Sequence, residues 1–227
     1  MKINLLNYFD EGALSNFPSS IAVKDENCDI TFADLENYSK NLAFQIINSL
    51  GSTGHPIAVF MPKCSEVIIS NLAILYSGNF YTNFDFSSPE ERIKNLIKSI
   101  APRLIISNQE GINKLKNLDI FDENLILNVD DSISSKILHD SNSIANIVSK
   151  KIDTDPACII STSGSTGVPK SVVLSHRNII DFIDWCNETF VFEHSDVIGS
   201  LSPFHFDIYI LELFVSLSKG CTIHLIP

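Results

Sequence analysis

Apolar residues recur along the chain with two different spacings, one typical of helices and the other of short buried strands. Leu35, Leu42 and Ile46 repeat at helical spacing between Thr31 and Gly51. Thr31 has an acidic residue three positions later, which is the pattern of a helix cap, and glycine commonly ends a helix. This part of the sequence therefore predicts one long helix.

A second clear helix start lies at Ser88-Pro89-Glu90. Serine favours the cap position, proline the first helical position and glutamate the first turn, so a helix is expected to continue to about Ile100. Short runs rich in β-branched and aromatic residues predict strands between the helices. The expected helices are 31–50, 65–76, 88–100, a helix from about 178, and 208–218, and the expected strands are 57–60, 80–84, 103–107, 124–129, 157–162, 172–175, 197–201 and 221–226.

This alternation of helices and strands predicts an α/β fold with layered parallel sheets flanked by helices. Residues 130–151, rich in Ser, Asn and Asp, have weak periodicity and are expected to form a connector. The last strand ends at Pro227 with no helix after it to cover it. From this ending we expect a longer fold that has been truncated.

Composition and charge narrow the classes of function. With 227 residues, 44% of them hydrophobic, the chain is long enough to bury a core. Its net charge of −11 argues against a broad nucleic-acid surface, because binding to phosphate backbones needs clustered Lys and Arg. The five cysteines include no CxxC pair and are expected to be reduced thiols, mostly in the core. No apolar run reaches the ~20 residues of a membrane span, and the N-terminal run is too short for a signal peptide, so we expect a cytoplasmic protein without a membrane partner.

The densest group of polar residues is the segment STSGSTGVPKS, residues 161–171, between two predicted strands. Its glycines let backbone amides approach an anion closely, its hydroxyls donate hydrogen bonds, and Lys170 adds a full positive charge. A flexible polar turn has a similar composition, and the lysine and the flanking strands favour a phosphate-binding loop over that alternative. A P-loop NTPase is excluded, because Pro169 stands where the GxxxxGK(S/T) motif needs glycine and a strand follows instead of a helix.

The sequence TSGSTGVPKS within this loop resembles the signature (S/T)SG(S/T)TGxPKG of the adenylate-forming superfamily. It departs from that pattern at Ser171, where the family usually has glycine, and the SHRNI that follows (175–179) also fits the family. The resemblance is closest to amino-acid adenylation domains and to enzymes like D-alanine–carrier-protein ligase. It implies that the phosphates of ATP are held by Thr162, Ser163, Gly164, Ser165, Thr166, Gly167 and Lys170.

Earlier segments extend the resemblance over most of the chain. ITFADLENYSKNLA (30–43) is similar to the family's TYxEL helix region. GNFYTNFDFSSPEERI (78–93) resembles the family's GxAYVPLDPxxPxERI, with Asn83 and Phe86 in place of prolines. The resemblance thus implies the N-terminal portion of the adenylate-forming synthetase fold.

The segment SPFHFD resembles the family's FDxS region, in which the aspartate holds the α-ammonium group of an amino acid. Phe206 and Asp207 match that motif, and Tyr209 replaces its serine. The resemblance implies that Ile208 and Leu211 line the side-chain pocket. An ordinary N-cap remains the alternative for Asp207, and helix-face core remains the alternative for the other two. His205 within this segment and His176 before it are interpreted more simply as structural residues, and no His or Cys spacing suits a metal.

The reaction implied by the resemblance is ATP-dependent activation of a carboxylic acid, here an amino acid. The carboxylate attacks the α-phosphate to give an acyl-adenylate and pyrophosphate, with Mg²⁺ neutralising charge. The acyl group then passes to a thiol, either the phosphopantetheine of a carrier protein or coenzyme A. Because family-like sequence starts almost at once, we expect a stand-alone ligase rather than an internal module of a larger assembly.

In complete members of the superfamily, the adenine loop with the metal ligands, the ribose-binding aspartate and the catalytic lysine all follow the region resembled here. The resemblance therefore implies an incomplete N-terminal domain over 1–227 that lacks the C-terminal subdomain and is inactive alone. Residues 1–150 would form a first α/β subdomain, and 151–227 would carry the phosphate loop and the start of the acid-binding subdomain. The alternative is a remnant or half-protein that binds nucleotide weakly or pairs with a second chain.

Overall fold

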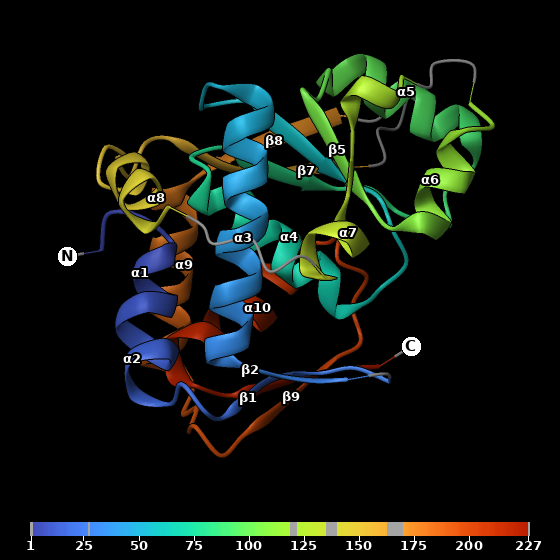
Figure 1. The fold of residues 1–227 in the computed structure, drawn as a ribbon. Coiled ribbons are helices and arrows are strands. Elements are labelled where there is room, and N and C mark those ends of the chain that lie inside the picture. The colour runs from blue at the N-terminus through green and yellow to red at the C-terminus, as the bar shows by residue number, and fades with distance from the viewer. Residues whose placement is uncertain (1, 27, 119–121, 135–139, 163–169, 227) are drawn as a thin grey trace.

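Two β-sheets form the framework of the fold, and helices lie between and around them (Figure 1). The computed structural model describes residues 2–26, 28–118, 122–134, 140–162 and 170–226. Within these residues, no helix is both long enough and apolar enough to cross a membrane.

The strands of both sheets run mostly parallel. Among the described residues, sheet A has the order β2-β1-β10-β9 and sheet B the order β6-β5-β3-β4-β7-β8. Of the strand pairs that the structure describes, only β1–β2 and β7–β8 are antiparallel. The strand bounds are β1 Ile21–Lys24, β2 Asp29–Thr31, β3 Pro56–Val59, β4 Phe80–Asn83, β5 Leu104–Ser107, β6 Ile126–Asn128, β7 Pro156–Thr162, β8 Lys170–Ser175, β9 Val197–Ser200 and β10 Thr222–Leu225.

Helices connect the parallel strands, so the predicted α/β fold with layered parallel sheets is confirmed. The α-helices are α1 Leu6–Tyr8, α2 Leu14–Asn16, α3 Phe32–Leu50, α4 Ser65–Tyr76, α5 Glu90–Ile100, α6 Gln109–Leu115, α7 Val129–Ser134, α8 Ser141–Val148, α9 His176–Thr189 and α10 Ile208–Lys219. A π-helical turn, η1, spans Phe9–Ala13, and a 3-10 turn, η2, spans Glu123–Leu125.

The long helix α3 begins and ends where its sequence predicts. The Thr31 side chain accepts a hydrogen bond from the Asp34 amide at 3.1 Å, so it caps the first turn. Gly51 follows the helix in the left-handed conformation with φ of 62°, which glycine adopts without steric cost. Local chemistry is therefore sufficient to set both ends.

The predicted cap of α5 is wrong in detail. The helix starts at Glu90, Pro89 occupies the cap position, and no side chain caps the first turn. The hydroxyl of Ser88 instead donates to the Asp85 carboxylate at 2.9 Å, and that carboxylate also accepts from the amide and the hydroxyl of Ser87. Because Asp85 holds Ser88 in a turn, the serine does not reach the helix amides.

Some elements were not predicted. The expected connector over 130–151 contains most of α7 and all of α8, whose first turn is capped by Asp140. Helix α9 starts at His176, two residues before the expected start, because Ser175 and Asn178 form a reciprocal capping box. The N-terminal helical segment and the β1–β2 hairpin were also not predicted.

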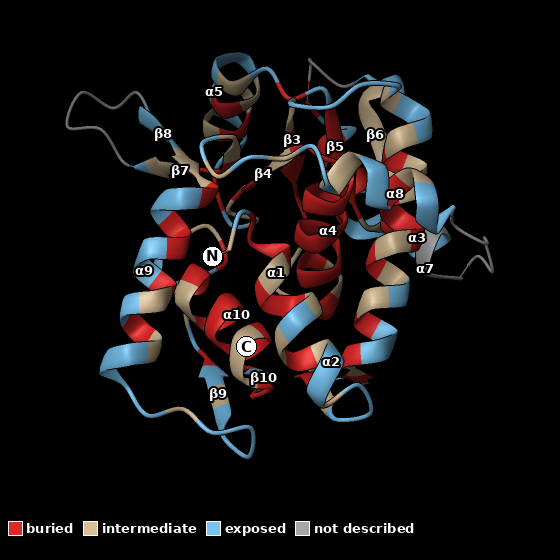
Figure 2. Ribbon diagram, turned by 90° about the vertical axis from the view of Figure 1, so that its left-hand side faces the viewer, coloured by how far each residue is buried: buried red, intermediate tan, exposed pale blue. Residues whose placement is uncertain are grey.

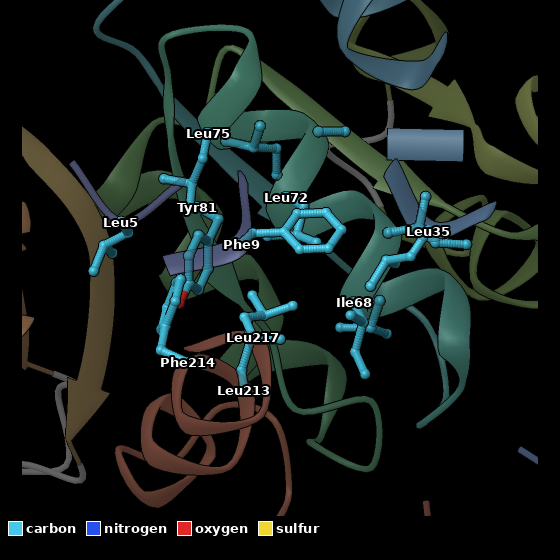
Figure 3. Close-up of a cluster of buried hydrophobic side chains, with 14 of the residues drawn as sticks. Leu5, Phe9, Leu35, Ile68, Leu72, Leu75, Tyr81, Leu213, Phe214 and Leu217 are labelled. Atoms are coloured by element: carbon cyan, nitrogen blue, oxygen red, sulfur yellow. The ribbon is translucent and has the colours of Figure 1, made fainter. Parts of the chain in front are cut away.

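The core follows the period-2 alternation of the strands in sheet B. Ile57 and Val59 of β3 face the cluster between the two sheets, whereas Ala58 faces a smaller cluster with α5 and α6. Figure 3 shows side chains of η1, α3, α4 and α10, among them Phe9 and Leu213, gathered in the larger cluster. This packing fixes α10, and with it the predicted acid-binding segment, against the sheets.

The N-terminal segment packs closely on α10. A side chain at Gly12 would place its Cβ 2.7 Å from the Leu217 carbonyl oxygen, so only glycine allows this approach.

All five cysteines are free thiols, and Cys158, Cys186 and Cys221 are buried. The expectation of reduced, mostly buried cysteines is thus met.

Candidate functional site

The predicted phosphate loop joins the antiparallel strands β7 and β8. Thr162 lies opposite Lys170 and Ser161 opposite Ser171 in the strand register. The Thr162 hydroxyl donates to the Lys170 carbonyl at 3.3 Å, and the hydroxyls of Ser161 and Ser171 are 3.0 Å apart. These contacts close the base of the loop and place the Thr162 hydroxyl and the Lys170 backbone on its two sides.

The structure describes only part of the predicted phosphate site. Thr162 and Lys170 are both exposed at the mouth of the hairpin. A strand, β8, begins at Lys170 itself, and no helix follows the loop, as expected when the P-loop NTPase class was excluded. The remaining predicted phosphate-binding residues, Ser163, Gly164, Ser165, Thr166 and Gly167, lie outside the described residues.

Asp207 occupies the cap position of α10 without acting as a cap. Its backbone is already helical, with φ of −66° and ψ of −32°, and its side chain makes no capping hydrogen bond. Within the described residues, its carboxylate has no hydrogen-bond or ion-pair partner. The side chain is exposed, whereas a charge-assisted hydrogen bond to an amine is strongest where water is excluded. The ordinary N-cap interpretation therefore does not account for this aspartate.

A hollow of about 290 Å³ lies beside Asp207, between β8, α9 and the start of α10. Apart from Asp207 and Asn178, its walls are apolar. Such a combination of apolar walls with a few polar groups is typical of small-molecule sites. The lining residues are Leu174, Asn178, Ile179, Phe182, Asp207, Ile208 and Ile210.

The structure brings together only some of the residues predicted for acid binding. Ile208 lines the hollow with Asp207, but Leu211 is not in its lining and packs against the main core. Phe206 is 52% exposed and lies against the ring of His205, with 4.5 Å between ring centroids. For Leu211 the core alternative fits the observed packing, because its side chain packs against the main core instead of the hollow.

Sequence reasoning missed the wall of the hollow that α9 provides. Its inward face is buried through Ile180 and Ile183, while Phe182 and Trp185 remain exposed on the outward face with ring centroids 6.1 Å apart. The two aromatic residues Phe182 and Trp185, three positions apart on the face opposite Ile180 and Ile183, are a signal that is visible in the sequence. Only the packing of α9 next to α10 shows that Phe182 shares a hollow with Ile208.

The two histidines near the site differ in environment. His176, the first residue of α9, is buried and its Nδ1 accepts a hydrogen bond from the Leu5 amide at 3.2 Å. Burial, helped by the positive charge of Lys151, lowers the pKa of His176 to about 4. Burial also lowers the pKa of His205, although the negative charge of Asp85 opposes that shift. His176 is therefore a neutral structural residue, as expected.

A second cavity, of about 350 Å³, lies at the carboxyl ends of β3 and β4 in sheet B. The segments that follow β9 and β10 of sheet A also line it. Lys63 enters its lining and donates to the carbonyls of Ser200 and Ile226, the latter at 3.0 Å. Burial lowers the pKa of the Lys63 amine. Lys63 follows β3 of sheet B, and its amine donates to carbonyls at the ends of two strands of sheet A. Lys63 therefore has a structural role, because it joins the ends of the two sheets.

The described part of the chain contains no cluster of three or more His, Cys, Asp or Glu side chains that could hold a metal ion. Its site therefore consists of a hydroxyl and an amine at the hairpin and an apolar hollow with one carboxylate. Leu174 of the hollow and Lys170 lie four residues apart on β8, about 13 Å along the strand. One extended ligand along β8 could contact both.

Comparison with known proteins gives consistent results. A model of the family described as AMP-binding enzyme matches residues 10–227. The hydroxamate-type ferrichrome siderophore peptide synthetase of Schizosaccharomyces pombe is 31% identical over 238 aligned positions, which cover 100% of this chain but 5% of that protein.

Solved structures have the same fold. The nonribosomal peptide synthetase FmoA3 (S1046A) superposes with a TM-score of 0.86 at 22% identity, covering all of this chain and 23% of that one. The N-terminal subdomain of NpsA from Klebsiella oxytoca superposes with a TM-score of 0.83 at 22% identity and is covered to 56%. The chain thus spans a small part of the large synthetases and about half of the isolated subdomain.

Proposed function

The chain belongs to the AMP-binding enzyme family, and from this membership we propose that it supplies the phosphate loop and one wall of the acid site for ATP-dependent activation of an amino acid. The product is an acyl-adenylate, which passes to the thiol of a carrier protein or of coenzyme A. A cytoplasmic location is part of this proposal. Relatives that are peptide synthetases support it at the level of the family.

The observation that carries the proposal is the exposed Asp207 carboxylate beside the apolar hollow. A carboxylate without a hydrogen-bond partner among the described residues suits an α-ammonium group, because charge-assisted hydrogen bonds are strong. The hollow of about 290 Å³, with Phe182 and Ile208 in its walls, suits an apolar side chain. The substrate we propose is therefore an amino acid whose side chain is apolar.

The contribution of this chain to the reaction is positioning and charge stabilisation. The carboxylate oxygen of the acid attacks the α-phosphorus, and the bond to pyrophosphate breaks. Lys170, Thr162 and the loop residues 163–167 hold the phosphates and offset the negative charge that builds on the leaving group. Asp207 and the hollow hold the acid in line for attack.

Mg²⁺ neutralises phosphate charge in this family, but the described residues do not offer a ligand cluster for it. No step through the metal is assigned to this chain.

The proposed division at residue 150 separates two roles, with 1–150 as scaffold and 151–227 as the ligand-binding part. Sheet A combines strands from both parts, so the two fold together.

The test is calorimetric titration of Mg-ATP into the purified chain at concentrations that detect millimolar binding. We expect binding that is lost in Lys170→Ala and kept in Lys150→Ala, which removes an exposed charge before β7. Because Lys150 lies outside the loop, it controls for net charge. Equal binding by all three proteins would contradict the assignment of the loop.

A second candidate function is a non-catalytic protein that binds nucleotide weakly or pairs with a second chain. The exposure of the apolar side chains Phe182 and Ile208 in the walls of the hollow favours this candidate. Both candidates predict that the chain alone does not catalyse the reaction. Under the first, the chain alone is still expected to form no hydroxamate from amino acids, ATP and hydroxylamine, because the residues implied for adenine, ribose and the final lysine are not among its 227. Hydroxamate formation would contradict both.

A further inference from the structure

The apolar hollow has two polar residues in its walls, Asp207 and Asn178. The proposed function assigns Asp207 to the α-ammonium group of the substrate and leaves Asn178 without a role. Asn178 belongs to the first turn of α9, and Figure 2 shows α9 running down one side of the molecule from β8, with α10 beside it. Asn178 therefore lies where β8, α9 and the start of α10 meet around the hollow.

The capping box of α9 fixes the orientation of the Asn178 side-chain amide. Its Oδ1 accepts a hydrogen bond from the Ser175 backbone amide at 3.0 Å and another from the Ser175 hydroxyl at 2.8 Å. A backbone N–H can only donate, so the atom that meets it must be the oxygen of the side chain and not its nitrogen. The two donors on Nδ2 are thus on the branch of the amide that is turned away from Ser175.

The Nδ2 group of Asn178 has no hydrogen-bond partner within the residues that the structure describes. The side chains of Phe182 and Ile208, which share the hollow with it, offer no acceptor. The Asp207 carboxylate, on the other helix, is likewise without a capping partner. The hollow thus presents one acceptor group and one donor group within otherwise apolar walls, which is how small-molecule sites orient a ligand.

The position of Asn178 relative to β8 decides which part of a bound amino acid it meets. Lys170 begins β8 and Ser175 ends it, so the two lie about 16 Å apart along the strand. Because Asn178 is hydrogen-bonded to Ser175, it lies at the end away from the phosphate loop. In the proposed reaction the carboxyl group must reach the α-phosphorus of an ATP held at Lys170, so it points toward the loop. The end of the substrate side chain then points toward Asn178.

We propose that Asn178 is a specificity-determining residue, whose amide donates a hydrogen bond to an oxygen near the end of the substrate side chain. The inference rests on the proposed function and refines its substrate class. The side chain has an apolar stem, which packs against Phe182 and Ile208, and an acceptor oxygen at its tip. A donor in such a wall favours this side chain over an apolar one of the same shape, because the apolar one leaves the donor unpaired.

The test compares two ligands of the same shape, leucine and its ketone analogue, in which a carbonyl oxygen takes the place of one methyl group. The ketone can accept a hydrogen bond but cannot donate one. Each ligand is titrated by calorimetry into the purified chain at concentrations that detect millimolar binding. Because Asn178 is exposed and neutral, we expect the ketone to bind about three- to tenfold more tightly than leucine, which is the range for one such hydrogen bond.

Asn178→Asp separates this role from the role of Asn178 in the cap. Aspartate keeps an oxygen for the Ser175 amide, so α9 should start at the same residue, but it has no N–H to donate. We expect the ketone to lose its advantage over leucine in this variant. Asn146→Asp makes the same change at an exposed residue of α8 and should leave the ratio of the two affinities unchanged. A purely structural role for Asn178 predicts an unchanged ratio in both variants.

Asp207→Asn tests the proposed function independently. It should weaken both ligands alike, because both carry the ammonium group, and should leave their ratio unchanged. Equal binding of the two ligands to the unchanged chain, or an unchanged ratio in Asn178→Asp, overturns the inference while the amine role of Asp207 stands. Affinities that Asp207→Asn leaves unchanged would contradict the amine role alone. If neither ligand binds, the amino-acid site is refuted and the inference is overturned with it.

Discussion

Protonation of His176 should destabilise the fold in mildly acidic solution. The ring is buried, and its neutral Nδ1 accepts the Leu5 amide, so this contact joins the N-terminal segment to the start of α9. A proton on Nδ1 would remove the acceptor and bury a charge near Lys151. These effects lower the pKa to about 4 from the ordinary 6.5.

The sign of the pH dependence follows from this shift. The folded protein binds the proton more weakly than the unfolded chain, so the stabilisation is complete above pH 6.5 and is lost as the pH falls toward 4. At about 1.4 kcal/mol for each pKa unit, the loss is about 3 kcal/mol. The negative charges of Asp153 and Asp155 oppose this shift.

Urea denaturation followed by circular dichroism at several pH values between 7.5 and 4.5 measures this effect. The unchanged chain should lose stability steeply below pH 6.5, while His176→Gln, which keeps a polar group without that titration, should be less stable at pH 7.5 and less sensitive to acid. His205→Gln is the matched control at a half-buried histidine. If the pH dependence of His176→Gln equals that of the unchanged chain, the reasoning is wrong.

Two further changes test how α9 is held. Tyr8→Phe removes a buried hydroxyl that donates a hydrogen bond to Asp184 at 2.5 Å, so we expect the free energy of unfolding in urea to fall by about 1–3 kcal/mol. The control, Tyr38→Phe, should change it little. Equal effects of the two substitutions would contradict a role for that hydrogen bond. The neighbours Phe182 and Ile183 should separate surface from core. Phe182→Ala is expected to change stability by less than about 0.5 kcal/mol because the ring is 38% exposed, whereas Ile183→Ala, fully buried, should cost about 2–5 kcal/mol. A large cost for Phe182→Ala would mean that the ring is part of the core.

Much of the local structure could be predicted because its causes lie within a few residues. Thr31 and Gly51 set the ends of α3 through contacts inside one turn. Ser88 shows the limit of this reasoning, because Asp85, a residue outside the helix pattern, takes its hydroxyl. The proposed phosphate loop was likewise inferred from adjacent residues, and of its predicted members Thr162 and Lys170 fall within the described structure.

The sequence alone determined the class of fold, the family and the place of the loop, because these depend on spacing and on local motifs. Tertiary structure decided the rest. Ile208 and Leu211 are equivalent as apolar positions on one helix, yet only Ile208 meets the hollow, since the wall comes from α9 and β8. Sheet A joins β1 to β10 across two hundred residues. Such contacts depend on how distant segments pack together, which no local pattern records.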